Sequence, residues 1–387
     1  MIILVINCGS SSAKYKLYNV EKDIFLAEGV VERIGEKQPT HTYNRRAVKE
    51  PLKRKVEAAD HHDAMELILE ILVDKDWGVI KSLDEISGVG HRVVHGGEEF
   101  NKSVLIDEKV IASITKFIKL APLHNPPALS GIKATRKLLS SKPQVAVFDT
   151  AFHQTMPPEA YTYALPYKFY RKYGMRRYGF HGTSHKYVAG KAAKILNKPI
   201  KDLKIVTCHL GNGCSMAAVL NGKAVDTSMG FTPLEGLVMG TRCGDIDPAI
   251  VTFLMERENL GIHEMDKLLN KNSGILGISE ISNDVREINS AIKEGNQQAK
   301  LAMEVFYYRI KKYIGLYIAV MNGIDAIVLT AGIGENNPWI KERLTKDLSE
   351  ILDKFNAKVL VIPTKEEWMI AMETCGLIKG CKVSEKV

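Results

Sequence analysis

The sequence predicts an α/β protein of two domains, and three observations support this prediction. At 387 residues the chain exceeds what one simple hydrophobic core usually holds, so a division into two domains is expected. A unit made of an apolar strand, a glycine-rich turn and a returning strand occurs twice. A further apolar strand, residues 326–330, leads into a third glycine-rich segment, residues 331–336, which we expect to form a turn. We place the first domain at residues 1–150 with a C-terminal helix at about residues 370–387, and the second at residues 151–369.

Both copies of the repeated unit are expected to form an antiparallel meander. In the first copy, residues 2–6 and 14–20 form strands around a turn at residues 7–12, and a third strand starts at Ile24. In the second copy, strands at residues 205–208 and 215–220 enclose a turn at residues 209–213. The dipeptide Asn221-Gly222 is typical of a type I′ hairpin, so residues 223–227 should return as a third strand.

The two turns are rich in glycine and small hydroxyl residues, which let backbone N–H groups approach a bound oxyanion. Either turn alone could be an ordinary hairpin, but the matched pair favours phosphate binding. A Walker A loop is absent, which excludes P-loop chemistry. The repeat resembles the sugar kinase, hsp70 and actin superfamily. That resemblance implies two ribonuclease H-like α/β domains with mixed sheets that face an interdomain cleft.

Composition excludes several other classes of protein. The apolar runs are far shorter than the roughly 20 residues of a membrane span, and the N-terminal run resembles a strand more than a signal peptide, so we expect a cytoplasmic protein without membrane contact. The net charge of +8 suits anionic ligands, yet the lysines are scattered, which argues against nucleic-acid binding. The six cysteines lack the paired spacing of a zinc site.

Two arginines stand in loops flanked by glycine, Arg92 before Gly96-Gly97 and Arg242 between Gly240 and Gly244. Their planar, permanently charged side chains match phosphate and carboxylate oxygens, although a surface ion pair is the alternative for each. A packed or surface role is the commoner one for a lone histidine, but His181 and His209 lie among glycine and hydroxyl residues, which raises the chance of contact with a ligand.

Asp149 follows the apolar strand of residues 145–148, so its carboxylate should project where α/β proteins bind ligands. It could orient a catalytic group or accept a proton. A helix N-cap or a plain ion pair explains the same position equally well.

Three segments together resemble the signatures of the acetate kinase family: residues 5–12 (VINCGSSS), 178–185 (YGFHGTSH) and 330–336 (TAGIGEN). Further matching segments are residues 122–127, 148–153, 239–248 and 362–367, so the resemblance covers almost the whole chain. It implies a phosphotransferase that reversibly moves a phosphoryl group from ATP to acetate, giving acetyl phosphate and ADP, with Mg2+ as cofactor and Mn2+ able to substitute.

The resemblance also implies roles for individual residues. Asn7 and Glu366 would serve the metal ion, Arg92 the carboxylate or acyl phosphate, Asp149 acid/base chemistry, and His181 with Arg242 the transition state. The acyl group would contact Val94, Leu123, His124, Phe180 and Pro233. The nucleotide would contact Ser10, Ser12, Lys14, His209, Leu210, Gly211, Asn212, Gly213, Asp284, Val285, Arg286, Gly332, Ile333, Gly334, Glu335 and Asn336.

Domain roles follow from the same resemblance: the first domain lies on the acyl side, and the second binds nucleotide and forms a homodimer. Because a carboxylate is already a nucleophile at neutral pH, we expect Asp149 chiefly to orient Arg92 or the acetate. Two alternatives stay open. One is a propionate or other short-chain acyl kinase on the same scaffold, and the other is a non-catalytic nucleotide-binding protein of the actin or hsp70 type.

Overall fold

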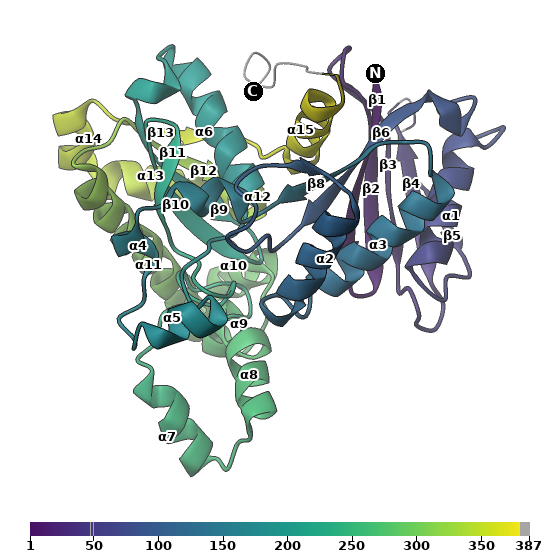
Figure 1. The fold of residues 1–387 in the computed structure, drawn as a ribbon. Helices are drawn as coiled ribbons and strands as arrows, with labels where there is room; N and C mark the ends of the chain where they lie inside the picture. Colours follow the sequence, from purple (N-terminus) through teal and green to yellow (C-terminus); the bar gives the residue numbers. More distant parts are fainter. Residues whose placement is uncertain (47, 49, 380–387) are drawn as a thin grey trace. The chain divides into compact units, whose positions relative to one another are not determined.

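The computed structural model describes residues 1–46, 48 and 50–379. The chain divides into two compact units, which we call unit 1 and unit 2. Unit 1 comprises Met1–Ala151 and the chain from Lys365 onward, and unit 2 comprises Phe152–Thr364. Each unit contains one mixed β-sheet with helices packed against it (Figure 1). The predicted α/β class with two mixed sheets is therefore confirmed.

Unit 1 is built around an eight-stranded sheet of order β5-β4-β3-β2-β1-β6-β8-β7. Its elements are β1 (Ile2–Gly9), β2 (Ser12–Asn19), β3 (Ile24–Glu32), β4 (Thr40–Arg45), β5 (Leu52–Lys55), α1 (His61–Val73), β6 (Ile86–Val93), β7 (Val104–Leu105), α2 (Glu108–Lys116), α3 (Asn125–Leu138), β8 (Gln144–Phe148) and α15 (Glu366–Lys379). The first five strands run antiparallel to one another, whereas β1, β6 and β8 are parallel.

The first glycine-rich turn is shorter than predicted. Strands β1 and β2 remain paired as far as Gly9 and Ser12, so only Ser10 and Ser11 form the turn. Asn7 therefore lies within the ladder, directly opposite Lys14. The prediction ended the first strand at Ile6 because the polar residues begin there, but main-chain pairing does not require apolar side chains.

Helices cover both faces of the unit 1 sheet. Helix α3 packs on β1 and β6 and also against α1, while α15 packs on β1, β2, β6 and β8. Strand β6 approaches α15 closely because two of its residues are glycines. A Cβ at Gly90 would lie 2.7 Å from Ile370 Cγ2, which is too short for real atoms. Helix α15 thereby places its first residue, Glu366, beside the sheet.

Unit 2 has a five-stranded sheet of order β11-β10-β9-β12-β13. Its elements are α4 (Pro158–Tyr161), α5 (Lys168–Tyr173), α6 (Gly182–Leu196), β9 (Lys204–Leu210), β10 (Cys214–Leu220), β11 (Lys223–Thr227), α7 (Ala249–Arg257), α8 (Ile262–Lys271), α9 (Gly274–Ser279), α10 (Val285–Lys293), α11 (Gln297–Met321), β12 (Ala326–Thr330), α12 (Ala331–Asn336), α13 (Pro338–Asp347), α14 (Ser349–Phe355) and β13 (Lys358–Val361).

The repeat predicted from the sequence extends further than its two hairpins. In unit 2, β9, β10 and β11 are antiparallel, and β12 and β13 join parallel to β9. Strands β1, β2, β3, β6 and β8 of unit 1 have the same order and directions. Asn221 and Gly222 have φ values of +54° and +79°, as a type I′ turn requires, so that prediction is confirmed.

Two predicted segments differ in detail. The third glycine-rich segment was expected to be a turn, but it forms the short helix α12 directly after β12. The C-terminal helix begins at Glu366 and is described to Lys379, and the rest of its predicted span, residues 380–387, lies outside the described residues. Within the described ranges, no helix combines the length and the apolar character needed to cross a membrane.

Three histidines of unit 1 are buried in their neutral form. His91 on β6 is hydrogen-bonded through Nε2 to Gln144 Oε1 at 2.8 Å, and burial lowers its pKa to about 4. Burial also lowers the pKa of His95 to about 3. The pKa of His41 falls to about 4 because of burial and the nearby charge of Arg54. Each of these groups binds a proton more readily in the unfolded chain, where its pKa is near 6.5.

The stability of the protein should therefore decrease as the pH falls below about 6.5, since protonation of these histidines favours the unfolded state. By linkage, a histidine such as His91 costs about 2 kcal/mol of unfolding free energy at about pH 5. Urea unfolding across this pH range measures the effect. His91→Asn should flatten the pH dependence, whereas His263→Gln, at an exposed position, should leave it unchanged. Equal slopes for native protein and His91→Asn would contradict this account.

Candidate functional site

The predicted site residues form two groups, one in each unit. In unit 1 they lie at the carboxyl ends of β1, β6 and β8 and at the start of α15. In unit 2 they lie at the carboxyl end of β9, at the start of α6, around α12 and in the irregular segment between β11 and α7. We describe each group by itself.

An ion pair between Arg92 and Asp149 forms the centre of the unit 1 group. Arg92 Nε donates to both carboxylate oxygens, at 3.1 and 3.2 Å, and Nη2 donates to Oδ2 at 2.7 Å. Asp149 is fully buried and Arg92 is half-buried. This two-pronged contact occupies one edge of the guanidinium. Nη1 has no hydrogen bond to the described residues, so it can bind another oxyanion.

The sheet explains why these two residues meet. Arg92 is the penultimate residue of β6 and Asp149 follows β8, and these strands are parallel neighbours. The Asp149 N–H donates to Val93 O at 3.0 Å, which continues the pairing beyond the end of β8. Carboxyl ends of parallel strands lie at one edge of a sheet, where α/β proteins form ligand sites.

Buried neighbours hold the loop after β6. Asn125, the first residue of α3, accepts from His95 N–H at 3.2 Å and donates to His95 O at 3.0 Å. The Gly96 N–H donates to Thr150 Oγ1 at 3.1 Å, which ties this loop to the residues after β8. Arg92 therefore projects from a region with little freedom to move. Burial alone would lower the pKa of Arg92, but the carboxylates of Asp149 and Glu366 raise it, so the side chain stays charged.

The predicted metal-site residues are also in unit 1. Burial raises the pKa of Glu366 to about 7; Arg92 opposes this, and the carboxylates of Asp149 and Glu367 reinforce it. Asn7, with Lys14 and Glu367, lines a hollow of about 380 Å³ over β1 to β4. Crowded carboxylates beside an amide oxygen suit a hard divalent cation. The described residues hold no cluster of three or more acidic, histidine or cysteine ligands, so such an ion would depend mainly on water and phosphate oxygens.

The predicted acyl-contacting residues are divided between the units. In unit 1, Val94 follows β6, and the Asn125 contacts bring the segment of Leu123 and His124 beside it. Leu123 is 64% exposed, so it is free to contact a small ligand. In unit 2, Phe180 is buried next to His181, and Pro233 accepts a hydrogen bond from Arg242.

The unit 2 group contains a network of histidines and hydroxyls. His181 Nδ1 and His185 Nε2 both hydrogen-bond to Ser215 Oγ, at 2.9 and 2.8 Å. The rings of His181 and His209 stack at 4.2 Å, and His209 Nδ1 hydrogen-bonds to Ser184 Oγ at 2.8 Å. His181 caps helix α6 with φ of +55°, a conformation that a non-glycine residue adopts only under constraint. Four contacts with neighbouring elements thus fix the imidazole orientations.

Arg242 lacks a carboxylate partner among the described residues. Its Nη1 donates to Pro233 O at 3.1 Å and contacts Met239 Sδ at 3.7 Å. Burial lowers the pKa of Arg242, and only the nearby Cys214 thiol acts in the opposite direction. A half-buried guanidinium without a counter-charge is unfavourable unless a ligand supplies one.

Gly213 lies close to both Arg242 and His181. A Cβ at this position would lie 3.3 Å from Arg242 Nη1 and 3.6 Å from His181 Cε1. The guanidinium, the imidazole and the backbone of the β9 to β10 turn therefore border the same small space. This arrangement offers a fixed positive charge and an imidazole to an oxyanion.

The predicted nucleotide segments meet in unit 2 around a cavity of about 650 Å³. Eight predicted residues line it: Gly211, Asn212, Asp284, Val285, Arg286, Gly332, Ile333 and Asn336. Segments far apart in the sequence are thus brought together, and the volume suits a small organic ligand. Asp284 caps helix α10 and pairs with the exposed Arg286, which holds the pKa of Asp284 at about 2.

Other predicted nucleotide residues shape this region from outside the cavity. Glu335 accepts from the backbone N–H groups of Ala331 and Thr364, at 2.8 and 3.1 Å, so it supports the connection from β12 to α12. Gly334 lies against Leu210: an added Cβ would lie 3.6 Å from the leucine Cβ, which is an ordinary van der Waals distance. In unit 1, Ser10 is exposed in the β1 to β2 turn, and Ser12 pairs with Gly9.

Three asparagines that line the cavity were not predicted: Asn283, Asn289 and Asn337. Asn283 donates to Asn212 Oδ1 at 3.0 Å, and Asn289 donates to Asn337 Oδ1 at 3.0 Å. Asn283 and Asn337 directly adjoin predicted segments, so widening those segments by one residue would have included them. Helical spacing places Asn289 one turn after Arg286 on α10, which is a signal that the sequence does contain.

Comparison with known proteins shows which family the chain belongs to. The sequence matches the profile of the Acetokinase family over residues 2–353. It is 54% identical to a protein named acetate kinase from Clostridium novyi (strain NT), over 98% of this chain and 99% of that protein. It is 55% identical to the acetate kinase of Caldanaerobacter subterraneus subsp. tengcongensis, over 99% and 100% of the two chains.

Solved structures give the same result. The crystal structure of Porphyromonas gingivalis acetate kinase superposes with a TM-score of 0.94 at 47% identity, covering 98% of this chain and 100% of that one. A propionate kinase from Francisella tularensis superposes with a TM-score of 0.89 at 42% identity, covering 97% and 99%. Because the family profile and these relatives span nearly the whole chain, the protein belongs to the acetokinase family.

Proposed function

We propose that this protein catalyses the reversible, Mg2+-dependent transfer of a phosphoryl group from ATP to acetate, giving acetyl phosphate and ADP. The observation that carries the proposal is the half-buried Arg242 guanidinium, which lacks a carboxylate partner among the described residues and lies beside Gly213 together with His181. Phosphoryl transfer needs positive charge at the equatorial oxygens of the migrating group more than it needs covalent chemistry. Membership of the acetokinase family supports the same reaction.

The nucleotide would occupy the cavity of unit 2. Gly211 and Asn212 line this cavity and directly precede Gly213, so phosphates that follow the β9 to β10 turn would lead toward Arg242 and His181. Glycines in this turn let backbone N–H groups approach phosphate oxygens. The side-chain amides of Asn283, Asn289 and Asn337, which also line the cavity, offer both donors and acceptors to a nucleoside.

The acceptor carboxylate would bind to Arg92. Asp149 occupies the Nε and Nη2 edge of this guanidinium, and Nη1 remains for the acetate or the acyl phosphate. One acetate oxygen would attack the γ-phosphorus as the bond to the β–γ bridging oxygen breaks, so ADP leaves with the electron pair. No proton needs to move, because a carboxylate is ionised at neutral pH. Asp149 therefore acts as a positioning residue for Arg92.

The transition-state and metal-site residues each have a proposed role in the transfer. Arg242 and His181 would stabilise charge on the migrating phosphoryl group, as Arg92 holds the acceptor. Asn7 and Glu366 would hold Mg2+, for which Mn2+ can substitute, and the metal ion would supply charge neutralisation at the nucleotide phosphates. Glu366 is suited to this role because neighbouring carboxylates and burial make a bound cation favourable there.

Acyl hydroxamate formation tests the proposed reaction directly. With Mg-ATP, acetate and hydroxylamine, the protein should form acetyl hydroxamate, and omission of acetate should abolish the signal. Propionate should react more slowly by about 10-fold, since one methylene in an apolar pocket is worth about 1–3 kcal/mol. Faster reaction with propionate would favour the propionate kinase alternative, which the Francisella tularensis neighbour raises. No acyl product with either acid, despite ADP binding, would indicate a non-catalytic nucleotide-binding protein.

Asp149→Asn tests the role of the buried carboxylate. This change keeps the shape of the side chain but removes the charge that orients Arg92, so kcat/KM for acetate should fall by about 100-fold. The pH profile of kcat should keep its shape, because Asp149 transfers no proton in the proposed mechanism. Steady-state kinetics across pH, with a melting curve to verify folding, gives both values. Near-complete loss of turnover together with a lost pH dependence would instead support acid/base catalysis.

We also propose that the protein is a homodimer that associates through unit 2. Helix α11 exposes Leu301, Tyr308, Leu316 and Val320, which are 47 to 61% accessible, and such apolar patches often mark interfaces. Light scattering should then give twice the chain mass of 43.1 kDa. Tyr308→Glu should shift the protein toward the monomer, whereas a native protein that is monomeric at micromolar concentration would contradict the proposal.

A further inference from the structure

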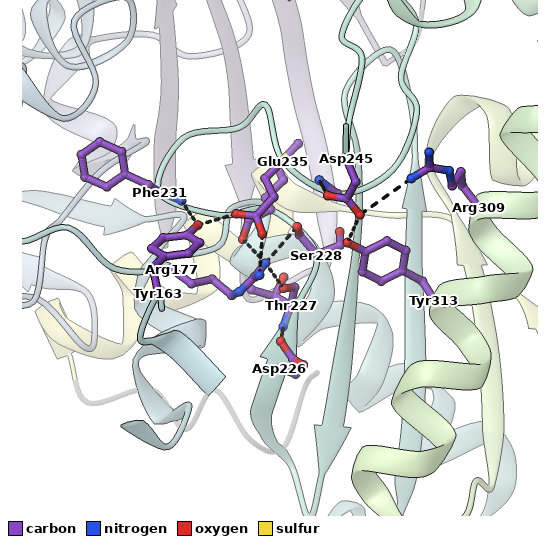
Figure 2. Close-up of polar contacts among 12 residues, drawn as sticks. Tyr163, Arg177, Asp226, Thr227, Ser228, Phe231, Glu235, Asp245, Arg309 and Tyr313 are labelled. Carbon is purple, nitrogen blue, oxygen red and sulfur yellow. Dashed lines mark hydrogen bonds and ion pairs between the residues drawn. The ribbon is translucent and has the colours of Figure 1, made fainter. Parts of the chain in front are cut away.

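A polar cluster in unit 2 joins the segment that carries His181 to the segment that carries Arg242 (Figure 2). Its central residues are Arg177, Glu235 and Tyr163, and we call them the clamp. We infer that the clamp residues are positioning residues for phosphoryl transfer, although they contact neither nucleotide nor acid in the proposed mechanism. This inference rests on the proposed function, because it assigns its effect to Arg242 and His181.

The segment that carries Arg242 needs external support. Between β11, which ends at Thr227, and α7, which begins at Ala249, the chain forms no helix or strand. Backbone groups in such a segment have no regular partners, and an irregular chain is free to move unless side chains or neighbouring loops hold it. Among the described residues, the half-buried guanidinium of Arg242 also forms no ion pair that could fix its position.

Arg177 holds the beginning of this segment through its guanidinium. Nη1 donates to the carbonyl oxygens of Thr227 and Ser228, at 2.9 and 3.1 Å, and Nη2 donates to Glu235 Oε1 at 2.6 Å. One planar side chain thus links both ends of the turn formed by residues 228–235. A lysine could not reproduce this, since its ammonium is a single point charge.

Glu235 and Tyr163 complete the clamp. The Tyr163 hydroxyl donates to Glu235 Oε2 and accepts from the Phe231 N–H at 2.8 Å. Gly230 leaves space for this contact, because an added Cβ would collide with the Glu235 carboxylate. Both oxygens of Glu235 are therefore hydrogen-bonded to the other two clamp residues, and Figure 2 shows its carboxylate between Tyr163 and Arg177.

The clamp acts on both proposed transition-state residues. Arg177 stands four residues before His181 in the chain, and Glu235 stands seven before Arg242. Beside the ion pair, the backbone N–H of Tyr178 donates to Gly230 O at 3.1 Å. The chain leading to His181 is thus fastened to the chain leading to Arg242 by side chains and by backbone.

A second anchor holds the far side of the Arg242 segment. Asp245 Oδ1 accepts from the Gly236 N–H at 2.8 Å, and Oδ2 accepts from the Tyr313 hydroxyl on α11 at 2.6 Å. The Asp245 N–H donates to Gly236 O at 2.9 Å, which closes residues 236–245 into a loop. Gly236 has φ of +110°, and a Cβ there would lie 2.5 Å from Ser228 O. The clamp reaches the guanidinium itself through Pro233, which lies in the turn of residues 228–235 and accepts from Arg242 Nη1 at 3.1 Å.

Kinetics of Glu235→Gln test the inference. Glutamine keeps the size of the side chain but removes the charge that pairs with Arg177, so the Arg242 segment should shift relative to His181. We expect kcat to fall by about 10- to 100-fold while KM for ATP changes by less than about 3-fold, because misplacement of catalytic groups affects the transition state most. Tyr163→Phe, a milder change in the same clamp, should reduce kcat by about 3- to 10-fold.

Glu304→Gln is the matched control. Glu304 forms an ion pair with Arg343 through two 2.7 Å hydrogen bonds in the same unit, but this pair links α11 to α13 and contacts neither the Arg242 segment nor His181. Its kcat should stay within about 2-fold of the native value, as expected for an exposed ion pair. Melting temperatures of all variants verify folding, and Tyr163→Phe carries the test if Glu235→Gln does not fold.

A double variant separates positioning from general support. If the clamp acts through Arg242, Glu235→Gln should reduce kcat by less than about 3-fold when added to Arg242→Ala. An equal effect in both backgrounds, or a clamp effect no larger than that of Glu304→Gln, would overturn the inference. Native turnover by Arg242→Ala alone would instead contradict the proposed function, so the two failures are distinguishable.

Discussion

Parallel pairing at the centre of each sheet is the constraint on which the site residues depend. Strands β6 and β8 run parallel to β1, and β12 and β13 run parallel to β9, so the carboxyl ends of these strands meet at one edge of each sheet. Asn7, Arg92 and Asp149 lie at that edge in unit 1, and His209 with the start of α12 lies at it in unit 2. Main-chain hydrogen bonds thus position side chains that no sequence-local interaction could bring together.

The two arginines differ in whether a buried carboxylate balances their charge. Arg92 faces a fully buried carboxylate through one edge, which fixes its direction and keeps its pKa high. Within residues 1–46, 48 and 50–379, the hydrogen-bond partners of Arg242 are a carbonyl and a thioether, and burial lowers its pKa. The Arg92–Asp149 ion pair is stable without a ligand, whereas the environment of Arg242 is favourable chiefly when a ligand brings negative charge. Rigidity around Arg242 must therefore come from the chain that carries it.

Predictions from the sequence succeeded where local chemistry decides structure. Apolar runs around a glycine-rich turn and the Asn221-Gly222 dipeptide located the meander of unit 2, and β11 and β12 have the predicted bounds. They failed at strand ends, since Asn7 and Cys8 continue the β1 ladder although they are polar. The third glycine segment was likewise expected to be a turn, but Glu335 accepts the Ala331 N–H, and a short helix forms. In both cases hydrogen bonds extended regular structure into residues that the apolar pattern did not mark.

By itself, the sequence determined the strands, the hairpins and the kinds of residue that could carry charge to a ligand. It identified Arg92, Asp149 and Arg242 as candidates, since type and spacing are local properties. Only the tertiary structure decided that Asp149 neutralises Arg92 and that Arg242 has no such partner in the part of the chain that the structure describes. It also decided that Asn283, Asn289 and Asn337 line the cavity and that Arg177 and Glu235 fasten two distant segments. The physical reason is that pairing and burial depend on distances between residues far apart in the chain, which spacing along the sequence does not encode.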